Sequence, residues 1–432
     1  MEKDFFRKFF QVSSSKAVLA LVILLSVQAA ASNYKFQFSR GPIKKGYIMV
    51  DKQTIYDHNC TYGYDLNTIP EGGKPFFFSV DLPEGNYRIE VTLGYKNSAT
   101  CTTVKSESRR LMLQNIKTIK GKYITRSFIV NLRNTKIGEI DSVRIKKREI
   151  GKLDWDNKLT LEFNGSNPSI VSLKIEKANI PTVFLAGNST MVDQDDEPWC
   201  GWGQILPRFF IPEIAVANYA ESGEAANTFV SSKRFAKLLT KMKKGDYLFI
   251  EFGHNDQKQK GENVGPYTSF KKNLKYLIDE TKKKGGIPIL VTPMHRRRFD
   301  ENGKIINTHG NYPDAVRQTA KEENISLIEL NNMSQILYEA WGDEASKKAF
   351  VHYPAGTYPN QTESLADNTH FNSYGGYEIC KCILKEIVDN NLPLKKYIVS
   401  DYKNFDPAHP DDVNKFNIPS TPFSSSIKPD GN

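Results

Sequence analysis

The sequence predicts an α/β protein of two modules, an antiparallel β-sandwich followed by a doubly wound parallel sheet of five strands. Two textures along the 432 residues predict it. Before about residue 180, apolar and polar residues alternate with the period of half-buried strands. After Pro181, short apolar runs alternate with amphipathic helical segments, which is typical of a parallel sheet covered on both faces. A composition with 39% hydrophobic and 25% charged residues is that of an ordinary globular protein.

The first 31 residues are expected to form a secretory signal peptide. Basic residues from Lys3 to Lys16 precede an apolar run over 17–27, and small residues follow at 29–31. This order is typical of a leader cleaved near Ala31, and the run is shorter than the ~20 residues of a membrane span. An uncleaved anchor is the alternative. The chain is therefore expected to be secreted or periplasmic, with no stable membrane span after cleavage.

The β-sandwich is expected over about residues 33–178. Alternation is clearest over 87–93, 159–163 and 171–175, and turn formers such as those at 83–86 separate the runs. No catalytic constellation is visible there. We expect this module to buttress the second one or to bind glycan weakly.

Cysteines and charge narrow the classes of function. Cys60 and Cys101 are candidates for a disulfide, whereas Cys380 and Cys382, two apart on a predicted helix, are expected to be buried thiols. Neither CxxC nor HExxH occurs, so no zinc site is expected. The net charge of +10 suits attraction to an acidic polymer such as pectin, with a solvated basic surface as the alternative. Scattered lysines and arginines without a recognition motif argue against nucleic acid.

The second module is expected over about residues 181–400. Its helices include one with an apolar face of Tyr267, Phe270, Leu274, Leu277 and Ile278, and a last helix over about 374–389. A Pro- and Ser-rich tail follows at 405–432, either a strap or a disordered segment. The five strand candidates are 182–186, 214–219, 247–252, 287–292 and 325–330.

Each of the first three strands ends in a small polar loop. These loops contain Ser189, Gly223 and Asn255. In a sheet of order 2-1-3-4-5 the first three strands are neighbours, and their carboxyl ends border the crevice where ligands bind. We therefore expect the three loops to converge.

The converging residues are those of an acyl-transfer site. Ser189, expected at the start of a helix, is the candidate nucleophile. Its N–H, the Gly223 N–H and the Asn255 amide can donate to an oxyanion. Asp367 precedes His370 by three residues, so the carboxylate can orient an imidazole that serves as the base. Each piece alone has an ordinary explanation, such as a helix cap, a turn or a surface pair, and only the combination favours catalysis.

The second module also resembles the SGNH (GDSL-type) hydrolases, and more widely the rhamnogalacturonan acetylesterase branch. The matching stretches are FLAGNSTMVD (184–193), GWGQILPRFF (201–210), IEFGHNDQ (250–257), VTPMHRRRFDENGKI (291–305), THGNYPDAVRQTAKE (308–322) and DNTHFNSYGG (367–376). The resemblance implies a flavodoxin-like hydrolase domain without a cofactor. It also implies Ser189 as nucleophile, His370 as base and Asp367 as its partner, with Ser189, Gly223 and Asn255 as oxyanion donors.

Two positions depart from that family pattern. Asn188 replaces the Asp that the resemblance leads us to expect before the serine, and a neutral amide can still bond locally. Glu224-Ala225 replaces Arg-Ser after Gly223, which changes the charge beside the oxyanion donors. We expect activity to survive the change at Asn188, whereas the change at Glu224-Ala225 bears on which substrate is bound.

Candidate substrate contacts follow the fourth strand and the serine loop. Arginine binds carboxylates bidentately, so Arg296, Arg297 and Arg298, with His295, suit a galacturonate; structural ion pairs are the alternative. Trp199 and Trp202 are expected to line the sugar groove or to pack under a loop.

The leading hypothesis is an O-acetylesterase acting on acetylated rhamnogalacturonan in plant cell-wall polysaccharide. Acetylated xylan, a lipid or a thioester are alternative substrates. An acyltransferase and a non-catalytic glycan-binding protein are further alternatives, although all four motif residues are present.

Overall fold

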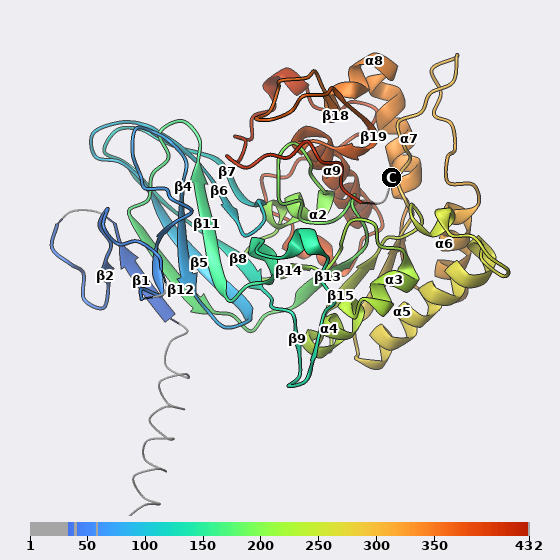
Figure 1. Ribbon diagram of the computed structural model, residues 1–432, viewed down its shortest axis with the longest axis horizontal. Helices are drawn as coiled ribbons and strands as arrows, with labels where there is room; N and C mark the ends of the chain where they lie inside the picture. Colours follow the sequence, from blue (N-terminus) through green and yellow to red (C-terminus); the bar gives the residue numbers. More distant parts are fainter. Residues whose placement is uncertain (1–32, 39–40, 58, 431–432) are drawn as a thin grey trace, which may run out of the picture.

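The computed structural model describes residues 33–38, 41–57 and 59–430 (Figure 1). The expected signal peptide lies outside these described residues. Within them, no helix is long and apolar enough to cross a membrane. The chain forms antiparallel sheets in its first part and a parallel five-stranded sheet with helices in its second, as the sequence predicts.

The first module is built from two five-stranded sheets. One has the order β2-β1-β12-β5-β8 and the other β3-β4-β11-β6-β7; only the β1–β2 pair is parallel within them. A small hairpin, β9–β10, lies beside them. The strands are β1 Asn33–Gln37, β2 Ile48–Met49, β3 Tyr62–Asp65, β4 Phe76–Asp81, β5 Gly85–Gly94, β6 Thr100–Ser106, β7 Arg110–Thr118, β8 Tyr123–Leu132, β9 Lys136–Ile137, β10 Asp141–Ser142, β11 Lys158–Asn164 and β12 Ser172–Lys177.

Alternation decides which residues enter the core of the sandwich. Tyr87, Ile89 and Val91 of β5 are fully buried, whereas the residues between them are partly exposed. They meet Phe78 and Leu161 of the other sheet in one apolar cluster. Burial of one face of each sheet makes the two sheets a sandwich.

The second module contains a parallel sheet of order β14-β13-β15-β16-β17, which is the predicted order 2-1-3-4-5. Every residue of β13, β14 and β15 is buried, which explains their continuous apolar runs. A two-stranded antiparallel hairpin, β18–β19, follows. The strands are β13 Thr182–Ala186, β14 Ala215–Asn218, β15 Tyr247–Ile250, β16 Ile287–Val291, β17 Ser326–Ile328, β18 Phe350–Tyr353 and β19 Leu365–Phe371.

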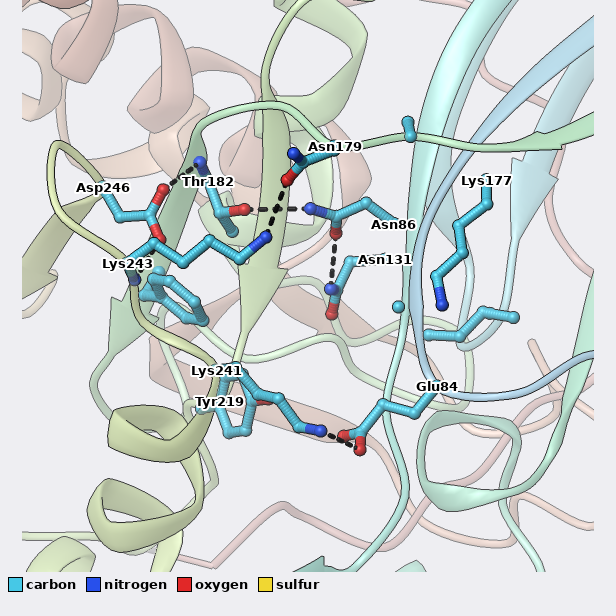
Figure 2. Close-up of a pocket in the computed structure, with 14 residues that line it drawn as sticks. Glu84, Asn86, Asn131, Lys177, Asn179, Thr182, Tyr219, Lys241, Lys243 and Asp246 are labelled. Carbon is cyan, nitrogen blue, oxygen red and sulfur yellow. Dashed lines mark hydrogen bonds and ion pairs between the residues drawn. The ribbon is translucent and has the colours of Figure 1, made fainter. Parts of the chain in front are cut away.

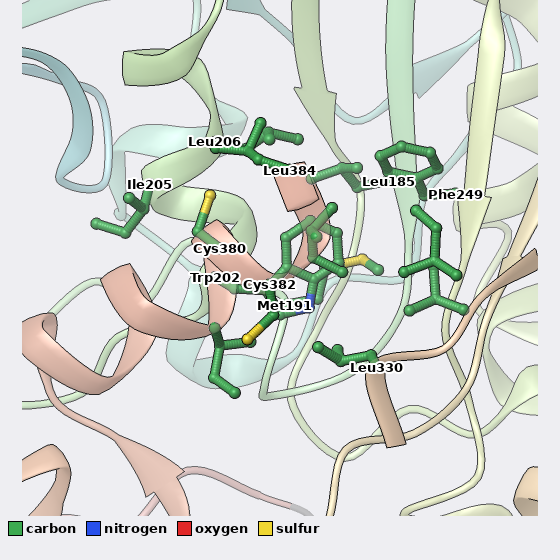
Figure 3. Packing of buried hydrophobic residues seen from close by; sticks show 14 of the residues in the cluster. Leu185, Met191, Trp202, Ile205, Leu206, Phe249, Leu330, Cys380, Cys382 and Leu384 are labelled. Atoms are coloured by element: carbon green, nitrogen blue, oxygen red, sulfur yellow. The ribbon is translucent and has the colours of Figure 1, made fainter. Parts of the chain in front are cut away.

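Helices cover both faces of this sheet (Figure 1). Val183 and Leu185 pack with α2, α7 and α9, and the neighbouring residues Phe184 and Ala186 pack with α3 to α6. Figure 3 shows part of the first cluster, with Cys380 and Cys382 buried in it. The helices are α2 Trp202–Ile205, α3 Ala226–Ser231, α4 Arg234–Lys241, α5 Lys271–Lys283, α6 Tyr312–Glu322, α7 Leu330–Trp341, α8 Asp343–Ser346 and α9 Ser373–Asp389.

Three sequence expectations are wrong. Tyr267 is exposed, because residues 266–270 form one turn of π-helix before α5. The Tyr267 hydroxyl donates to the Asp314 carboxylate. Cys60 and Cys101 are both free thiols. They lie at β3 and β6, which β4 and β11 separate in the sheet, a gap of about 14 Å that no disulfide spans.

The serine loop also differs from its prediction. No helix begins at Ser189; a tight turn follows instead, in which the N–H groups of Met191 and Val192 both donate to the Asn188 carbonyl. The next helix, α2, begins only at Trp202.

Candidate active site

The structure brings Ser189, His370 and Asp367 into one hydrogen-bonded chain. The Ser189 Oγ lies 2.8 Å from His370 Nε2, and His370 Nδ1 lies 2.7 Å from Asp367 Oδ2. All three residues are buried, with 3% of Ser189 exposed. A serine, an imidazole and a carboxylate in this order form an activated nucleophile.

A bulge in β19 aims His370 at the serine. The pairing with β18 passes from Val351–Asp367 to Phe350–Phe371, so residues 368–370 loop out of the ladder. Asp367 Oδ1 accepts the N–H groups of Thr369 and His370 and holds this loop. Asn372 then caps α9, which fixes the other end.

The same contacts keep Asp367 ionised. Burial by itself raises a carboxyl pKa, but the bond to His370, the charge of that ring and the two backbone N–H groups lower the pKa of Asp367 to about 2. The carboxylate is therefore charged at neutral pH and can stabilise an imidazolium.

The candidate oxyanion donors lie in the loops that follow β13, β14 and β15. Among the described residues, no protein acceptor takes the N–H of Ser189 or of Gly223, so both are available. Gly223 has φ +80°, a left-handed conformation that favours glycine. The Asn255 amide donates one hydrogen to the Glu224 carbonyl at 3.0 Å, which holds it on this loop and leaves its second hydrogen.

Buried hydrogen bonds support the serine turn. Thr190 Oγ1 contacts the Asn188 side-chain oxygen and Glu251, and Glu251 also accepts the Trp202 indole N–H at 2.6 Å. Asn188 thus bonds locally, as its neutral amide allows. Sequence reasoning missed Glu251, although a carboxylate at the end of the apolar run of β15 was the available signal. Burial raises the pKa of Glu251 to about 7.

The first module is part of this site's support. Arg110, at the start of β7, is almost fully buried and bonds Asp193 and Asp154 at 2.7 Å each. Arg109 bonds Glu197 at 2.6 Å. Both acceptors in the second module, Asp193 and Glu197, belong to the loop that follows Ser189. No sequence pattern linked these distant residues.

The charge of Glu224 is compensated from several sides. Its carboxylate lies 3.7 Å from Lys146 of the first module and 3.9 Å from Arg234 of α4. Arg148 of the first module pairs with Glu221 of the same loop. Glu224, which differs from the family pattern, therefore belongs to a network of ion pairs that connects the two modules.

The predicted substrate contacts after the fourth strand differ in burial. His295 and Arg297 are buried, whereas Arg296 and Arg298 are not. Arg297 is buried and bonds Ser346, Asn368 and Asp343, so it is structural. His295 is buried, and its backbone N–H donates to the Ser334 hydroxyl, while its ring Nδ1 has no hydrogen-bond partner among the described residues. Arg296 is half-buried and donates to the His254 carbonyl, beside Asn255. Arg298 is exposed.

Neither tryptophan lines an open groove. Trp202 is fully buried in the core and bonds Glu251. Trp199 lies edge-on to His370, with ring centroids 5.7 Å apart, and its indole donates to the Ser425 carbonyl. Packing under a loop, the second reading of these residues, describes both.

Two residues near the oxyanion donors carry shifted pKa values. Burial, with Arg296 and Lys428 nearby, lowers the pKa of Lys258 to about 8. His254 is buried against His309, and burial lowers its pKa well below the usual value. A neutral His254 suits a packing role and not that of a second base.

The tail expected at 405–432 packs against both modules as far as it is described. Tyr374 donates to the Asp411 carbonyl, and Lys105 of the first module donates to the Pro419 carbonyl. In Figure 1 this red segment runs from the sandwich to the second module. Thr421–Asp430 then passes the catalytic residues, with Lys428 Nζ 3.6 Å from Asp367.

A separate cavity of 540 Å³ lies between the modules at the opposite end of the parallel sheet (Figure 2). Asn86 bridges Asn131 and Thr182 there, and Lys241 pairs with Glu84. It lies at the first residue of β13, whereas Ser189 follows the last one. It holds none of the candidate catalytic residues.

Comparison with known proteins agrees with the chemistry of this site. Residues 185–375 match the GDSL-like Lipase/Acylhydrolase family. The chain is 42% identical over 220 residues to rhamnogalacturonan acetylesterase RhgT of Bacillus subtilis, covering 50% of this chain and 94% of RhgT. It is 36% identical to the probable rhamnogalacturonan acetylesterase YesY of the same organism, covering 51% of this chain and 98% of YesY.

A solved structure, that of protein YxiM from Bacillus subtilis, covers 84% of this chain and 99% of its own at 24% identity and a TM-score of 0.46. With a serine, a histidine and a carboxylate in hydrogen-bonded order and a matching family over the same residues, the chain belongs to the GDSL-like (SGNH) lipase/acylhydrolase family and is an esterase of that family.

Proposed function

We propose that this esterase removes acetyl groups from a plant cell-wall polysaccharide, with acetylated rhamnogalacturonan as the substrate. The observation that carries the chemistry is the chain Ser189–His370–Asp367, with successive separations of 2.8 and 2.7 Å, beside two available N–H groups. The 42% identity to RhgT, which covers nearly all of that protein, supports the substrate.

The geometry supports a two-step mechanism. Ser189 Oγ attacks the acetyl carbonyl while His370 Nε2 takes its proton, and the Asp367 carboxylate stabilises the imidazolium. The N–H groups of Ser189 and Gly223 and the Asn255 amide donate to the oxyanion. His370 then protonates the sugar hydroxyl that leaves. Water, deprotonated by the same ring, attacks the acetyl-serine, and acetate departs as Ser189 regains its proton.

The basic character of the protein supports an acidic polymer as partner. Lys258 and the half-buried Arg296 lie beside Asn255, next to the site. Cations near a site attract a polyanionic chain and raise its local concentration. No cofactor enters this mechanism.

We also propose that the protein is secreted or periplasmic. The mass of the mature protein would show cleavage near residue 31.

Two substrate series test the proposal. Acetate release should be faster from acetylated rhamnogalacturonan than from acetylated xylan. Rates on 4-nitrophenyl esters should fall steeply from acetyl to octanoyl, because a site crowded by polar and charged side chains lacks an apolar acyl channel. Faster hydrolysis of octanoyl esters would point to a lipase instead, and preference for acetylxylan would reject the pectin assignment.

The nucleophile is tested by Ser189→Ala. Without Oγ no acetyl-enzyme forms, and kcat on 4-nitrophenyl acetate should fall by about 10³-fold or more. Thr357→Ala, which removes a surface hydroxyl from the same module, is the matched control and should keep wild-type turnover. Equal rates for Ser189→Ala and the control would rule out this mechanism.

A further inference from the structure

The segment Thr421–Asp430 places the Asp430 carboxylate over the loop 219–225, which follows β14, contains Gly223 and is named the oxyanion loop. Asp430 Oδ2 lies 3.6 Å from Lys146 Nζ and 3.5 Å from Arg148 Nε. A Cβ added to Gly223 would lie 2.9 Å from both Asp430 Cβ and Lys146 Nζ. Asp430 therefore packs against Gly223, the glycine whose N–H is a candidate oxyanion donor.

Both cations come from the first module and are held firmly there. Lys146 precedes the short turn Lys147–Glu149 (η1), and Arg148 lies within it. Glu149 of this turn accepts the Lys146 N–H at 2.7 Å and the Arg234 guanidinium at 2.5 Å. Lys146 and Arg148 also both donate to the Ser222 carbonyl, the residue before Gly223. Their positions relative to the oxyanion loop are thus fixed.

The two cations remain reachable by a ligand. About a third of each side chain is exposed, 29% of Lys146 and 34% of Arg148. Asp430 is the most exposed member of the cluster, at 57%. Glu221 and Glu224, their other partners, are buried and belong to the loop itself. Asp430 is therefore the carboxylate that can leave with least rearrangement.

We propose that Lys146 and Arg148 form a carboxylate subsite of the active site, which Asp430 occupies in the free protein and a uronate carboxylate of the substrate occupies during catalysis. The uronate as ligand rests on the proposed function. One carboxylate replaces another, so the charge balance with the buried Glu221 and Glu224 is kept. Asp430 acts as an intramolecular competitor, whose effective concentration is set by the short segment that carries it.

Inhibition by an unacetylated galacturonate trimer tests the subsite. The trimer has no acetyl group, so it reports binding while 4-nitrophenyl acetate reports turnover. In Lys146→Ala/Arg148→Ala the inhibition constant should rise about three- to tenfold, the range for partly exposed charge pairs. In Asp430→Asn it should fall about threefold, because the competing charge is gone.

Lys152→Ala is the matched control. Lys152 pairs with Asp196 across the same module boundary at 3.0 Å and has similar exposure, but contacts neither Asp430 nor Gly223. Its inhibition constant should stay at the wild-type value, and Arg148→Lys should retain most of the affinity. The proposal is overturned if Asp430→Asn binds the trimer no better than wild type, or if the double variant matches Lys152→Ala.

Failure of the carboxylate subsite can be distinguished from failure of the proposed function. A wild-type protein that hydrolyses 4-nitrophenyl acetate but not acetylated rhamnogalacturonan contradicts the function alone. A protein that hydrolyses the polymer, with an inhibition constant insensitive to all three positions, contradicts the subsite alone.

Discussion

Two buried carboxyl groups near Ser189 show how residue environment sets charge. Asp367 faces an imidazole and two backbone N–H groups, and its pKa falls to about 2. Glu251 accepts hydrogen bonds from the uncharged donors of Thr190 and Trp202, and burial raises its pKa to about 7. The first carboxylate is suited to stabilise a cation, and the second to fix the turn that carries the nucleophile.

Replacing Asp367 with Asn should lower kcat by about 10³- to 10⁴-fold, because the amide cannot stabilise the imidazolium and disfavours the required tautomer. The fold should persist, since the Asn oxygen can still accept the N–H groups of Thr369 and His370. Turnover of 4-nitrophenyl acetate and circular dichroism measure the two effects. Wild-type turnover in Asp367→Asn would remove this residue from the mechanism.

Glu251 makes stability depend on pH. Its folded pKa of about 7 exceeds the ordinary 4.5, so the folded state holds the proton more tightly. Its contribution is full below about pH 4.5 and is lost as the pH rises through 7, a change of about 3 kcal/mol. Urea titrations at pH 5 and pH 8 should show a smaller loss of unfolding free energy for Glu251→Gln than for wild type. Equal losses would contradict the assigned shift.

At the residue scale, sequence reasoning could propose candidate residues where the chemistry is local in the chain. Asp367 and His370 are three apart, and each loop residue follows a recognisable strand end. It could not foresee the surroundings of Arg297 and Trp202, because a residue's type does not say whether a distant partner, such as Asp343 or Glu251, binds its polar atoms.

At the scale of elements, the strands of the parallel sheet could be predicted from the sequence. The bulge in β19 and the contact of Arg110 with the second module could not. Strands buried on both faces have continuous apolar runs, which fixed all five strands to within two residues at each end. The bulge in β19 arises from its pairing with β18, in which Phe350 and Phe371 are distant in the chain. The sequence around Arg110 carries no local sign that its guanidinium enters the other module.

The β6–β7 turn provides a stability prediction. Arg110→Ala removes the cation that bonds both Asp193 and Asp154 at 2.7 Å, and leaves only the longer contacts of Arg133, at 3.2 Å from Asp154 and 3.8 Å from Asp193. The free energy of unfolding should fall by about 3–5 kcal/mol. Lys52→Ala breaks an exposed pair in the same module and should change it by less than about 1 kcal/mol. Similar losses in both variants would show that Arg110 does not join the modules.

At the scale of the whole molecule, the sandwich is a structural part of the esterase. Arg109 and Arg110 bond the loop after Ser189, and Leu111 is buried in the core of the second module. The relatives RhgT and YesY match only about half of this chain. Sequence reasoning expected buttressing or weak glycan binding, and the buried ion pairs agree with the first.

Separating the modules should therefore inactivate the enzyme. Residues 179–430 produced alone would expose the surface that receives Leu111 and leave Asp193 without Arg110. We expect a melting temperature at least about 10 °C lower and loss of most turnover of 4-nitrophenyl acetate, measured beside the full chain. A fully active, equally stable fragment would show that the second module needs no support.

The central claim is that Ser189 forms a covalent intermediate at this site. A 4-nitrophenyl alkylphosphonate, which reacts with activated serines, tests it when activity and the labelled residue are followed together by mass spectrometry. The account predicts one equivalent of label on Ser189, inactivation in step with labelling, and no label at this position in a His370→Ala variant over the same period. Complete inactivation with the label on another residue, or full activity with Ser189 labelled, would contradict it.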